Sequence, residues 1–481
     1  MNSFNCSAYL EKQIEGIKKR INDFGGKLYL EFGGKLVDDY HAQRILPGFQ
    51  KDIKLKMLQR MSDDLEIIIC IFSKDIENSK VRGDYGLLYE EMLLKNIKFF
   101  KDNNLKVNSV VITRFDNELK SIKFKQKLES LNIDVHLHSS IIGYPENLDI
   151  VLSDEGFSKN SFIKTTKPLV VVTAPGALCG KLSTCLSQIY HEYKNGKSCG
   201  YVKYETFPVW NLPLNHPVNE AYEAATTDLR DVNMIDPFHL KEYKVSSVNY
   251  NRDIEAFPIL KNMLDKIMNK SIYKSPTDMG VNNLALFITN DENVKKSSRL
   301  EIIRRYLKAK VDYENGLCNK DTLNLNKNIL LRNDISLDER IIIKKAKEKA
   351  LLSNSISSAC LINNNIILSR TTNILTAPAS LILNVLKYFA NIEDNVFLVK
   401  EEVLTPMIEF KKKLNDDDNT KLSLNDVLMC LSIYEKTDKS IKKALSFLEN
   451  LQYIDVHFSS IINFDDQKTL KQLHIDFTMD I

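Results

Sequence analysis

The segment from Ala174 to Lys181, APGALCGK, has the residue types of a turn that binds an anion. It follows an apolar run, Leu169 to Thr173, and it precedes apolar residues at helical spacing between positions 182 and 189. A strand, a glycine-bearing turn and the start of a helix bring free backbone N–H groups and the positive end of a helix dipole to one point. The sequence therefore predicts an anion site here, with ligand contacts from Pro175, Gly176, Gly180, Ser183 and Thr184.

Only part of this turn matches a Walker A loop, which needs a glycine, four residues and then Gly-Lys-Ser/Thr. Gly180 and Lys181 fit that pattern, but Pro175 occupies the place of the first glycine. Leu182 follows the lysine, so the hydroxyl group that would hold magnesium is missing. The alternative is an ordinary strand-turn-helix whose glycines only satisfy backbone geometry. We favour an anion site over that alternative, and we disfavour a true nucleoside-triphosphatase loop.

Other candidate residues follow further predicted strands, because the carboxyl ends of the strands form the ligand crevice of an open α/β sheet. Lys181 is expected to neutralise the bound anion, and Asp154 or Glu155 to hold magnesium or act as a base. The rest of the expected pocket consists of Lys35, His41, Arg44 and Glu205. The predicted catalytic residues are Lys181, Asp154, Glu155 and His41, and Mg²⁺ with a nucleotide is the cofactor that this arrangement allows. Loops are polar in any case, so the alternative is that several of these side chains only cap helices.

The whole chain has 481 residues, too many for one ordinary core, so we expect two to three domains. Hydrophobic residues make up 43% of it and charged residues 27%, as in soluble globular proteins. The net charge of +3 argues against a dedicated nucleic-acid surface. The start lacks a signal peptide's apolar core, and no apolar run approaches the roughly 20 residues that span a bilayer. These features predict a cytoplasmic protein with no nucleic-acid or membrane partner.

The eight cysteines are scattered and include no C-x-x-C pair. This distribution indicates reduced thiols rather than a disulfide framework, and it predicts no zinc site. A third possibility for the chemistry of the chain is a reactive cysteine, Cys179 or Cys185, near the predicted helix start.

Short apolar runs alternate with helical patterns over residues 1–255, which predicts an α/β domain with a doubly wound, mostly parallel sheet. The strands are expected at Lys27–Phe32, Glu66–Phe72, Val107–Thr113, Asp134–His138, Asp149–Ser153, Leu169–Thr173 and Gly200–Glu205. Residues 207–280 are rich in Pro, Asn and Asp, which suggests an ordered lid or substrate loop, although its aspartates alone are better explained as turn and cap residues.

Residues 256–352 are expected to be mostly helical, and residues 353–481 to form a smaller C-terminal α+β domain. Ser358–Ile362 and Ile366–Ser369 flank three asparagines and predict a hairpin, which a long helix follows. This order is reminiscent of cytidine-deaminase-like folds. The helix start, Thr376-Ala377-Pro378, lacks the His-x-Glu element, and no Pro-Cys-x-x-Cys follows, so we expect a deaminase-like topology without the zinc chemistry.

Several long phrases together resemble one bacterial family, filed as domain of unknown function 1846. They include EFGGKLVDDYHAQRILPGF, KPLVVVTAPG with GKLSTCLSQIYHEYK, ETFPVWNLPLNHPVNEAYEAAT, DVNMIDPFHL, VNYNRDIEAFP and SPTDMGVN. The match is strong over about residues 9–310 and weaker in the C-terminal third. The resemblance implies a cytosolic, multi-domain homo-oligomer with no established biochemical activity.

The chain departs from this family at the central turn. Family members resemble A-P-G-P-G-S-G-K there, whereas this chain has Ala177, Leu178 and Cys179. Leu178 stiffens the loop and puts a bulky side chain where a phosphate would approach. The departure suggests a divergent paralogue with weakened activity. The leading hypothesis is nevertheless an enzyme, a transferase or hydrolase that binds a phosphorylated ligand or nucleotide at residues 174–181, and its rival is a non-catalytic binding or scaffold protein.

Overall fold

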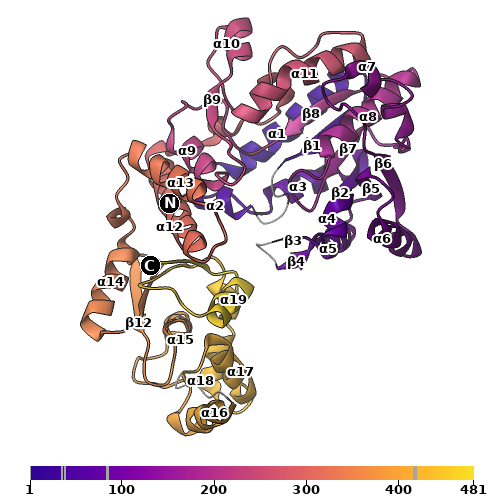
Figure 1. Cartoon of the computed structure of the whole chain (residues 1–481). Coiled ribbons are helices and arrows are strands. Elements are labelled where there is room, and N and C mark those ends of the chain that lie inside the picture. Colours follow the sequence, from indigo (N-terminus) through magenta and orange to yellow (C-terminus); the bar gives the residue numbers. More distant parts are fainter. Residues whose placement is uncertain (1, 34–35, 37–38, 83–85, 415–419) are drawn as a thin grey trace. The chain divides into compact units, whose positions relative to one another are not determined.

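The computed structural model describes residues 2–481 except 34–35, 37–38, 83–85 and 415–419. The chain divides into two compact units, unit 1 from Met1 to Ser298 and unit 2 from Arg299 to Ile481 (Figure 1). The division falls inside one helix, α12 (Asp291–Glu314). It differs from the boundaries at 255 and 352 that the sequence pattern suggested, and that three-part division stays a prediction.

Unit 1 contains a sheet of six parallel strands in the order β6-β5-β2-β7-β1-β8. Their bounds are β1 Leu28–Phe32, β2 Leu65–Phe72, β5 Val107–Phe115, β6 Asp134–Ser139, β7 Leu169–Thr173 and β8 Gly200–Tyr204. The inner strands are apolar almost throughout, because helices cover both faces of a parallel sheet. All of β7 is buried, and so is β2 except its last residue. The structure confirms the predicted α/β class and parallel sheet.

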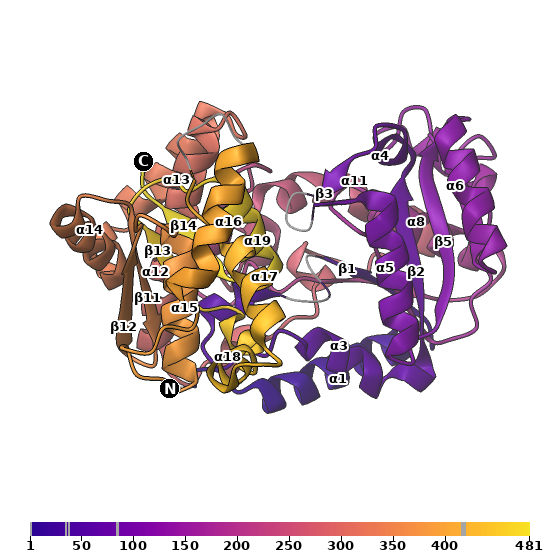
Figure 2. The same ribbon diagram turned by 90° about the horizontal axis from the view of Figure 1, so that it is seen from below.

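Helices lie on both faces of this sheet. The helix α5 (Tyr89–Asp102) contacts β2 and β5, whereas α8 (Lys181–Lys194) contacts β1, β7 and β8. The chain runs outward from β2 to β6 in one direction and from β7 to β8 in the other, so right-handed crossovers place the two sets of helices on opposite faces. Figure 2 shows α5 in front of β2 and α8 behind it. The point where the direction reverses lies between β2 and β7.

One predicted strand of this sheet is wrong. Residues 149–153 do not form a strand, and the short helix α7 (Leu148–Val151) lies there instead. The Asn147 side chain accepts a hydrogen bond from the Ile150 N–H at 3.2 Å and starts this helix. An N-cap of this kind outweighs the β preference of a run that has only three apolar residues in sequence.

The remaining elements of unit 1 are short or lie outside the sheet. They are α1 Cys6–Asp23, α2 Tyr40–Ile45, α3 Ile53–Arg60, α4 Ser73–Glu77, β3 Val81–Arg82, β4 Leu87–Leu88, α6 Leu119–Ser130, α9 Pro217–Ala225, β9 Asn233–Ile235, α10 Pro237–Tyr243, β10 Val248–Tyr250 and α11 Asn251–Met268. The segment 207–280 is therefore ordered. Two of its aspartates serve the backbone: Asp236 caps α10, and Asp278 accepts from the N–H groups of residues 274 and 275. Its role as a lid stays a prediction.

Unit 2 has its own sheet of four strands in the order β12-β11-β13-β14. The strand β11 is antiparallel to both of its neighbours, and β13 and β14 are parallel. The bounds are β11 Ser357–Ile362, β12 Asn365–Arg370, β13 Asp455–Phe458 and β14 Asp476–Met479. The structure confirms the hairpin and the separate C-terminal sheet domain, whereas the deaminase-like topology stays a prediction.

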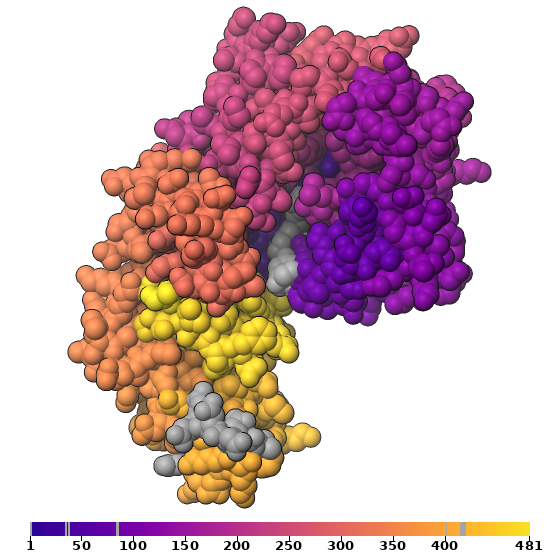
Figure 3. Space-filling view, in the orientation of Figure 1, coloured from indigo at the N-terminus to yellow at the C-terminus, as the bar shows by residue number. Residues whose placement is uncertain are grey.

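The helices of unit 2 include some that the sequence pattern assigned to a middle segment. They are the larger part of α12, α13 Lys320–Arg332, α14 Ile341–Ser353, α15 Ala377–Phe389, α16 Glu401–Leu414, α17 Leu424–Tyr434, α18 Lys439–Leu445 and α19 Phe464–Gln472. Within this unit, α14 packs on β11 and β12, and its Ile342 and Ala346 form a small core with Ala359. In the space-filling view the orange helical residues lie against the yellow C-terminal residues of the same unit (Figure 3). Among the described residues, no helix is long and apolar enough to cross a membrane.

Candidate functional site

The predicted turn between β7 and α8 exists, and close packing explains its two glycines. Gly180 starts α8 with a φ of +85°, a conformation that favours glycine. A Cβ atom there would come within 2.8 Å of the Thr113 hydroxyl oxygen. A Cβ atom on Gly176 would come within 2.4 Å of the Tyr89 hydroxyl oxygen. Both glycines are therefore required by the strands and helices around them, whatever the turn binds.

Carbonyl groups of this turn accept hydrogen bonds from cationic and hydroxyl side chains at neighbouring strands. Arg82 donates to the Pro175 carbonyl and Arg114 to the Leu178 carbonyl, while the Thr113 hydroxyl donates to the Cys179 carbonyl at 2.8 Å. No side chain caps α8 at Gly180. The first N–H groups of a helix have no partner within the helix, so those of α8 remain available to an anion or to water.

Lys181 lies at the first position of α8 and is partly exposed. In the part of the chain that the structure describes, no carboxylate forms an ion pair with it. The charge of Lys181 acts on the buried thiols of Cys70, Cys179 and Cys185, but burial outweighs it and raises the pKa of each thiol. Cys179 and Cys185 are therefore protonated thiols at neutral pH, not activated nucleophiles.

The two hydroxyl residues of the predicted site differ. Thr184 is fully buried and accepts a hydrogen bond from the Cys70 thiol at 3.3 Å, so it belongs to the core. Ser183 hydrogen-bonds to Tyr144, whose pKa is raised to about 12 because its phenol is buried. Of the two hydroxyl residues in the first turn of α8, Ser183 is therefore the one that is not buried in the core.

Asp154 and Glu155 do not share the site with Lys181. The Asp154 carboxylate is 92% exposed and lies 3.5 Å from Lys194, at the last position of α8, and Glu155 pairs with Lys159. The 14 residues of α8 make this helix about 20 Å long, so the two carboxylates lie about that far from the turn. Because the predicted strand before them is a helix, they are not strand-end residues.

The predicted residues from the N-terminal part lie near the end of β8. His41 is in α2 and packs edge to face on Phe207, with 5.3 Å between the ring centroids, while Arg44 is in the last turn of the same helix. The helix starts at Asp39, which pairs with the buried Lys54 at 2.7 Å and accepts from Thr206 at 3.4 Å. Lys35 lies outside the described residues.

A partly buried charged cluster surrounds Glu205, the predicted site residue that follows β8. The Lys203 ammonium group lies 2.7 Å from the Asp253 carboxylate and 3.2 Å from the Glu205 carboxylate, and it also donates to the Tyr250 hydroxyl. Burial raises the pKa of Glu205 to about 7; Lys203 opposes the shift, and Asp253 and Glu31 add to it. Asp253 and Glu205 in turn raise the pKa of Lys203 against the effect of burial. Lys203 is therefore held charged, while Glu205 titrates near neutral pH.

Glu31 joins this cluster to the turn. It lies in β1, the strand between β7 and β8, and accepts a hydrogen bond from the Tyr201 hydroxyl at 2.7 Å. The charge of Glu31 raises the pKa of Glu205 and of Lys203. It also raises the pKa of Cys70 and Cys185, the two thiols whose pKa the charge of Lys181 lowers. The turn and the Glu205 cluster thus lie at the same carboxyl edge of the sheet.

Comparison with known proteins then gives the family. Residues 2–334 match the domain of unknown function DUF1846, N-terminal, and residues 338–481 match its C-terminal counterpart. The chain belongs to the DUF1846 family. It is 45% identical to a UPF0371 protein of Fusobacterium nucleatum and 44% identical to one of Clostridium tetani, over 99% of this chain and 97% of each relative. The resemblance seen in the sequence is confirmed, and it extends over the C-terminal third.

Sequence reasoning missed three members of the charged cluster in this DUF1846 protein: Glu31, Lys203 and Asp253. The first two had a visible signal, because each is a charged residue inside an otherwise apolar or aromatic strand, LYLEF and GYVKY. A charge at such a position needs a partner. Gly33 lies two residues after Glu31, and a Cβ atom there would come within 2.4 Å of the Glu205 side chain.

Proposed function

We propose that this protein is an enzyme that binds a small phosphorylated ligand, such as a nucleotide, at residues 174–181. In this proposal the first N–H groups of α8 and the Lys181 ammonium group hold the phosphate. Glu205 exchanges a proton with the ligand, because a carboxyl group with a pKa of about 7 can act as acid or base near neutral pH. The reaction class is a transfer or hydrolysis.

The observation that carries the proposal is the meeting of two features at one sheet edge. The turn supplies an uncapped helix start and a lysine without a carboxylate partner among the described residues, and Arg82 and Arg114 donate to its carbonyl groups. The cluster supplies three carboxylates, those of Glu31, Glu205 and Asp253, around one lysine. Ligands of open α/β sheets bind at this edge, beside the point where the strand order reverses.

Magnesium enters the proposal only as a companion of a bound nucleotide. Asp154 and Glu155 do not fit a magnesium site at the turn, because they lie at the far end of α8. Asp75 lies near the turn, but it pairs with Lys80 at 3.0 Å. In the described residues, no group of three or more His, Cys, Asp or Glu side chains is arranged to hold a metal ion. We therefore derive no catalytic step through a metal, and the expected lack of zinc stays a prediction.

The competing function is a non-catalytic binding or scaffold protein. It is favoured by the packing of the turn, since Tyr89 and Thr113 already account for both glycines, and by Leu178, whose side chain is exposed at a positive φ of 59°. A divergent paralogue with a degenerate site would have these features.

The proposal includes three further properties of the protein. They are a homo-oligomeric state, a cytoplasmic location and a deaminase-like topology of unit 2. The order of the strands in unit 2, in which the hairpin comes first, supports the topology.

A thermal-shift experiment separates the two functions. Nucleotides and sugar phosphates, each with magnesium, are added to the wild type, to Lys181→Ala and to Lys194→Ala. A ligand at about 100 times its dissociation constant stabilises the folded state by about 2.7 kcal/mol, which raises the melting temperature by roughly 5 to 10 °C. We expect this rise in the wild type and in Lys194→Ala, because Lys194 lies at the opposite end of the same helix.

Lys181→Ala should lose the rise while its ligand-free melting temperature stays near that of the wild type. If no compound shifts the wild type, or if Lys181→Ala responds equally, the site at the turn is wrong and the scaffold function stands. For a compound that binds, Glu205→Gln should retain binding and lose turnover. If turnover survives in Glu205→Gln, Glu205 is not the acid or base, and only the binding site at the turn is supported.

A further inference from the structure

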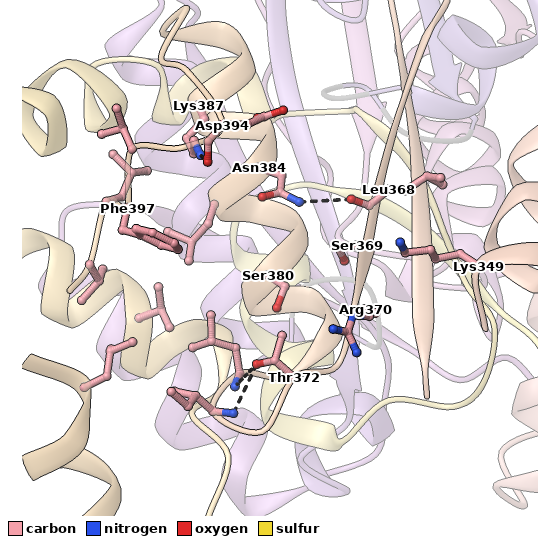
Figure 4. A pocket seen from close by; sticks show the side chains of 18 residues that line it. Lys349, Leu368, Ser369, Arg370, Thr372, Ser380, Asn384, Lys387, Asp394 and Phe397 are labelled. Carbon is pink, nitrogen blue, oxygen red and sulfur yellow. Dashed lines mark hydrogen bonds between the residues drawn. The ribbon is translucent and has the colours of Figure 1, made fainter. Parts of the chain in front are cut away.

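Unit 2 contains a cavity of about 470 Å³ that the proposed function does not use. Pockets of this size hold small organic ligands. One face of α15 lines it through Ser380, Leu383, Asn384 and Lys387, which follow one another at helical spacing. The edge strand β12 and the segment 394–399 supply other walls. Figure 4 shows Lys387 with Asp394 at one end of this face, Ser380 with Arg370 and Thr372 at the other, and Asn384 between them.

The charge on the cavity wall is unbalanced. Three cationic side chains line it, those of Lys349, Arg370 and Lys387, against the single carboxylate of Asp394. Lys387 is only 8% exposed, and its ammonium group donates to the Asp394 backbone carbonyl at 2.7 Å. Within the described residues, no carboxylate forms an ion pair with any of the three cations. A buried charge that is held by one carbonyl group leaves most of its desolvation cost unmatched.

A second observation comes from the same helix face. In the described part of the chain, the buried hydroxyl oxygen of Ser380 has no hydrogen-bond partner. Buried hydroxyl groups almost always have one. Because protein atoms cover this oxygen, it can bond to a ligand in the cavity only after the Ser380 side chain turns. Asn384 is not available in the same way, because its amide already donates to the Leu368 carbonyl at 3.1 Å.

Part of the cavity lining is apolar. Leu398, Leu404 and Val427 are buried there, while the Phe397 ring at the cavity is 79% exposed. An exposed aromatic ring beside a cavity gains apolar burial when a flat or apolar group covers it. The wall therefore matches a ligand that carries an apolar or aromatic body as well as a charge.

We propose that this cavity binds a small anion with an apolar or aromatic body, its anionic group at Lys387 and its body against Phe397. Arg370 and Lys349 add to the positive potential, and Ser380 supplies a hydrogen bond. The site is independent of the phosphate site at the β7–α8 turn, because all of its lining residues belong to unit 2.

Phenyl phosphate is the test probe, and its binding to the full chain is measured by titration calorimetry. Phenol and inorganic phosphate are the matched half-probes. We expect phenyl phosphate to bind at least tenfold more tightly than either of them, since it uses both walls. Lys387→Met should weaken binding by about tenfold or more, the usual effect of losing a hydrogen bond to a charged group. Arg370 is exposed, so Arg370→Gln removes a second positive charge from the cavity lining without a risk to folding.

The control variant is Lys468→Met, an exposed lysine of α19 outside the cavity, and it should bind the probe as the wild type does. Lys181→Ala removes the lysine of the proposed phosphate site in unit 1, so the binding that persists in this variant belongs to another site. The proposal is overturned if phenyl phosphate does not bind, if phenol binds equally well, or if neither Lys387→Met nor Arg370→Gln weakens binding. Loss of binding in Lys181→Ala alone would also overturn it, and would assign the probe to the turn of unit 1.

Discussion

Glu205→Gln tests whether the partly buried Glu205 cluster controls the stability of unit 1. The carboxyl group of Glu205 has a pKa of about 7 in the folded chain, against an ordinary value of 4.5. The folded state therefore holds this proton more tightly than the unfolded state does. As the pH rises from 4.5 through 7, the unfolded state loses the proton first, and the free energy of unfolding falls. Integrated over that range, the loss is about 3 kcal/mol at most.

Glutamine keeps the shape of the protonated side chain and cannot ionise. We expect Glu205→Gln to match the wild type within about 0.5 kcal/mol at pH 4 and to be more stable by about 2 to 3 kcal/mol at pH 8. Lys203 remains paired in the variant, because Asp253 lies 2.7 Å from it. The gain at alkaline pH comes from removing one of three carboxylates around a single lysine.

Urea unfolding followed by tryptophan fluorescence measures this effect in unit 1, since the only tryptophan of the chain is Trp210. The control is Glu155→Gln, whose exposed carboxylate pairs with Lys159 and whose change should be small at both pH values. If the pH profiles of wild type and Glu205→Gln run parallel between pH 5 and 8, Glu205 is not the group that titrates near 7.

Two further predictions concern acid sensitivity and the boundary between the units. Burial lowers the pKa of His138 to about 4, so the unfolded state takes up a proton first as the pH falls below 6.5. Unit 1 should therefore lose about 2 kcal/mol of stability between pH 7 and 5. An equal loss of stability over this pH range in a His138→Gln variant would contradict this. A fragment of residues 299–481 should unfold cooperatively by circular dichroism, whereas residues 353–481 should lack a fixed fold, because they lose α14 and the buried Arg340 that pairs with Asp455. If both fragments unfold with equal cooperativity, the C-terminal domain begins at residue 353 and not at residue 299.

The sheet of unit 1 was predictable because a parallel strand is buried on both faces. Runs such as LEIIICIF in β2 and LVVVT in β7 leave no polar face, and they indicate strands without any knowledge of their partners. The run near Asp149 was too short for that signal. A local hydrogen bond from the Ile150 N–H to Asn147 favours the helix there, and such a bond is not visible in hydrophobic periodicity.

The division of the structure at residue 298 is not visible in the sequence pattern for a related reason. The lysine-rich pattern of α14 indicates a solvated helix, and it gives no sign that Ile342 and Ala346 pack on the sheet that begins a few residues later. Arg340 is fully buried beside Asp455, more than a hundred residues away in the chain. Contacts of such long range follow from the fold and not from local spacing.

The candidate site shows the same division between local and distant information. The turn, Lys181 and Glu205 could be found from the rule that strand ends collect ligand-binding residues, and the same rule misplaced Asp154 and Glu155 because it depended on a strand that is a helix. Glu31 and Lys203 lie inside strands, and the rule applies only to residues that follow the end of a strand. A charged residue at a buried strand position costs several kcal/mol unless the fold supplies a partner, so such positions are stronger indicators of a site than charges in loops. In this chain the partner, Asp253, lies in the first turn of the helix α11, fifty residues after Lys203, and only the folded chain brings the two side chains within 2.7 Å of each other.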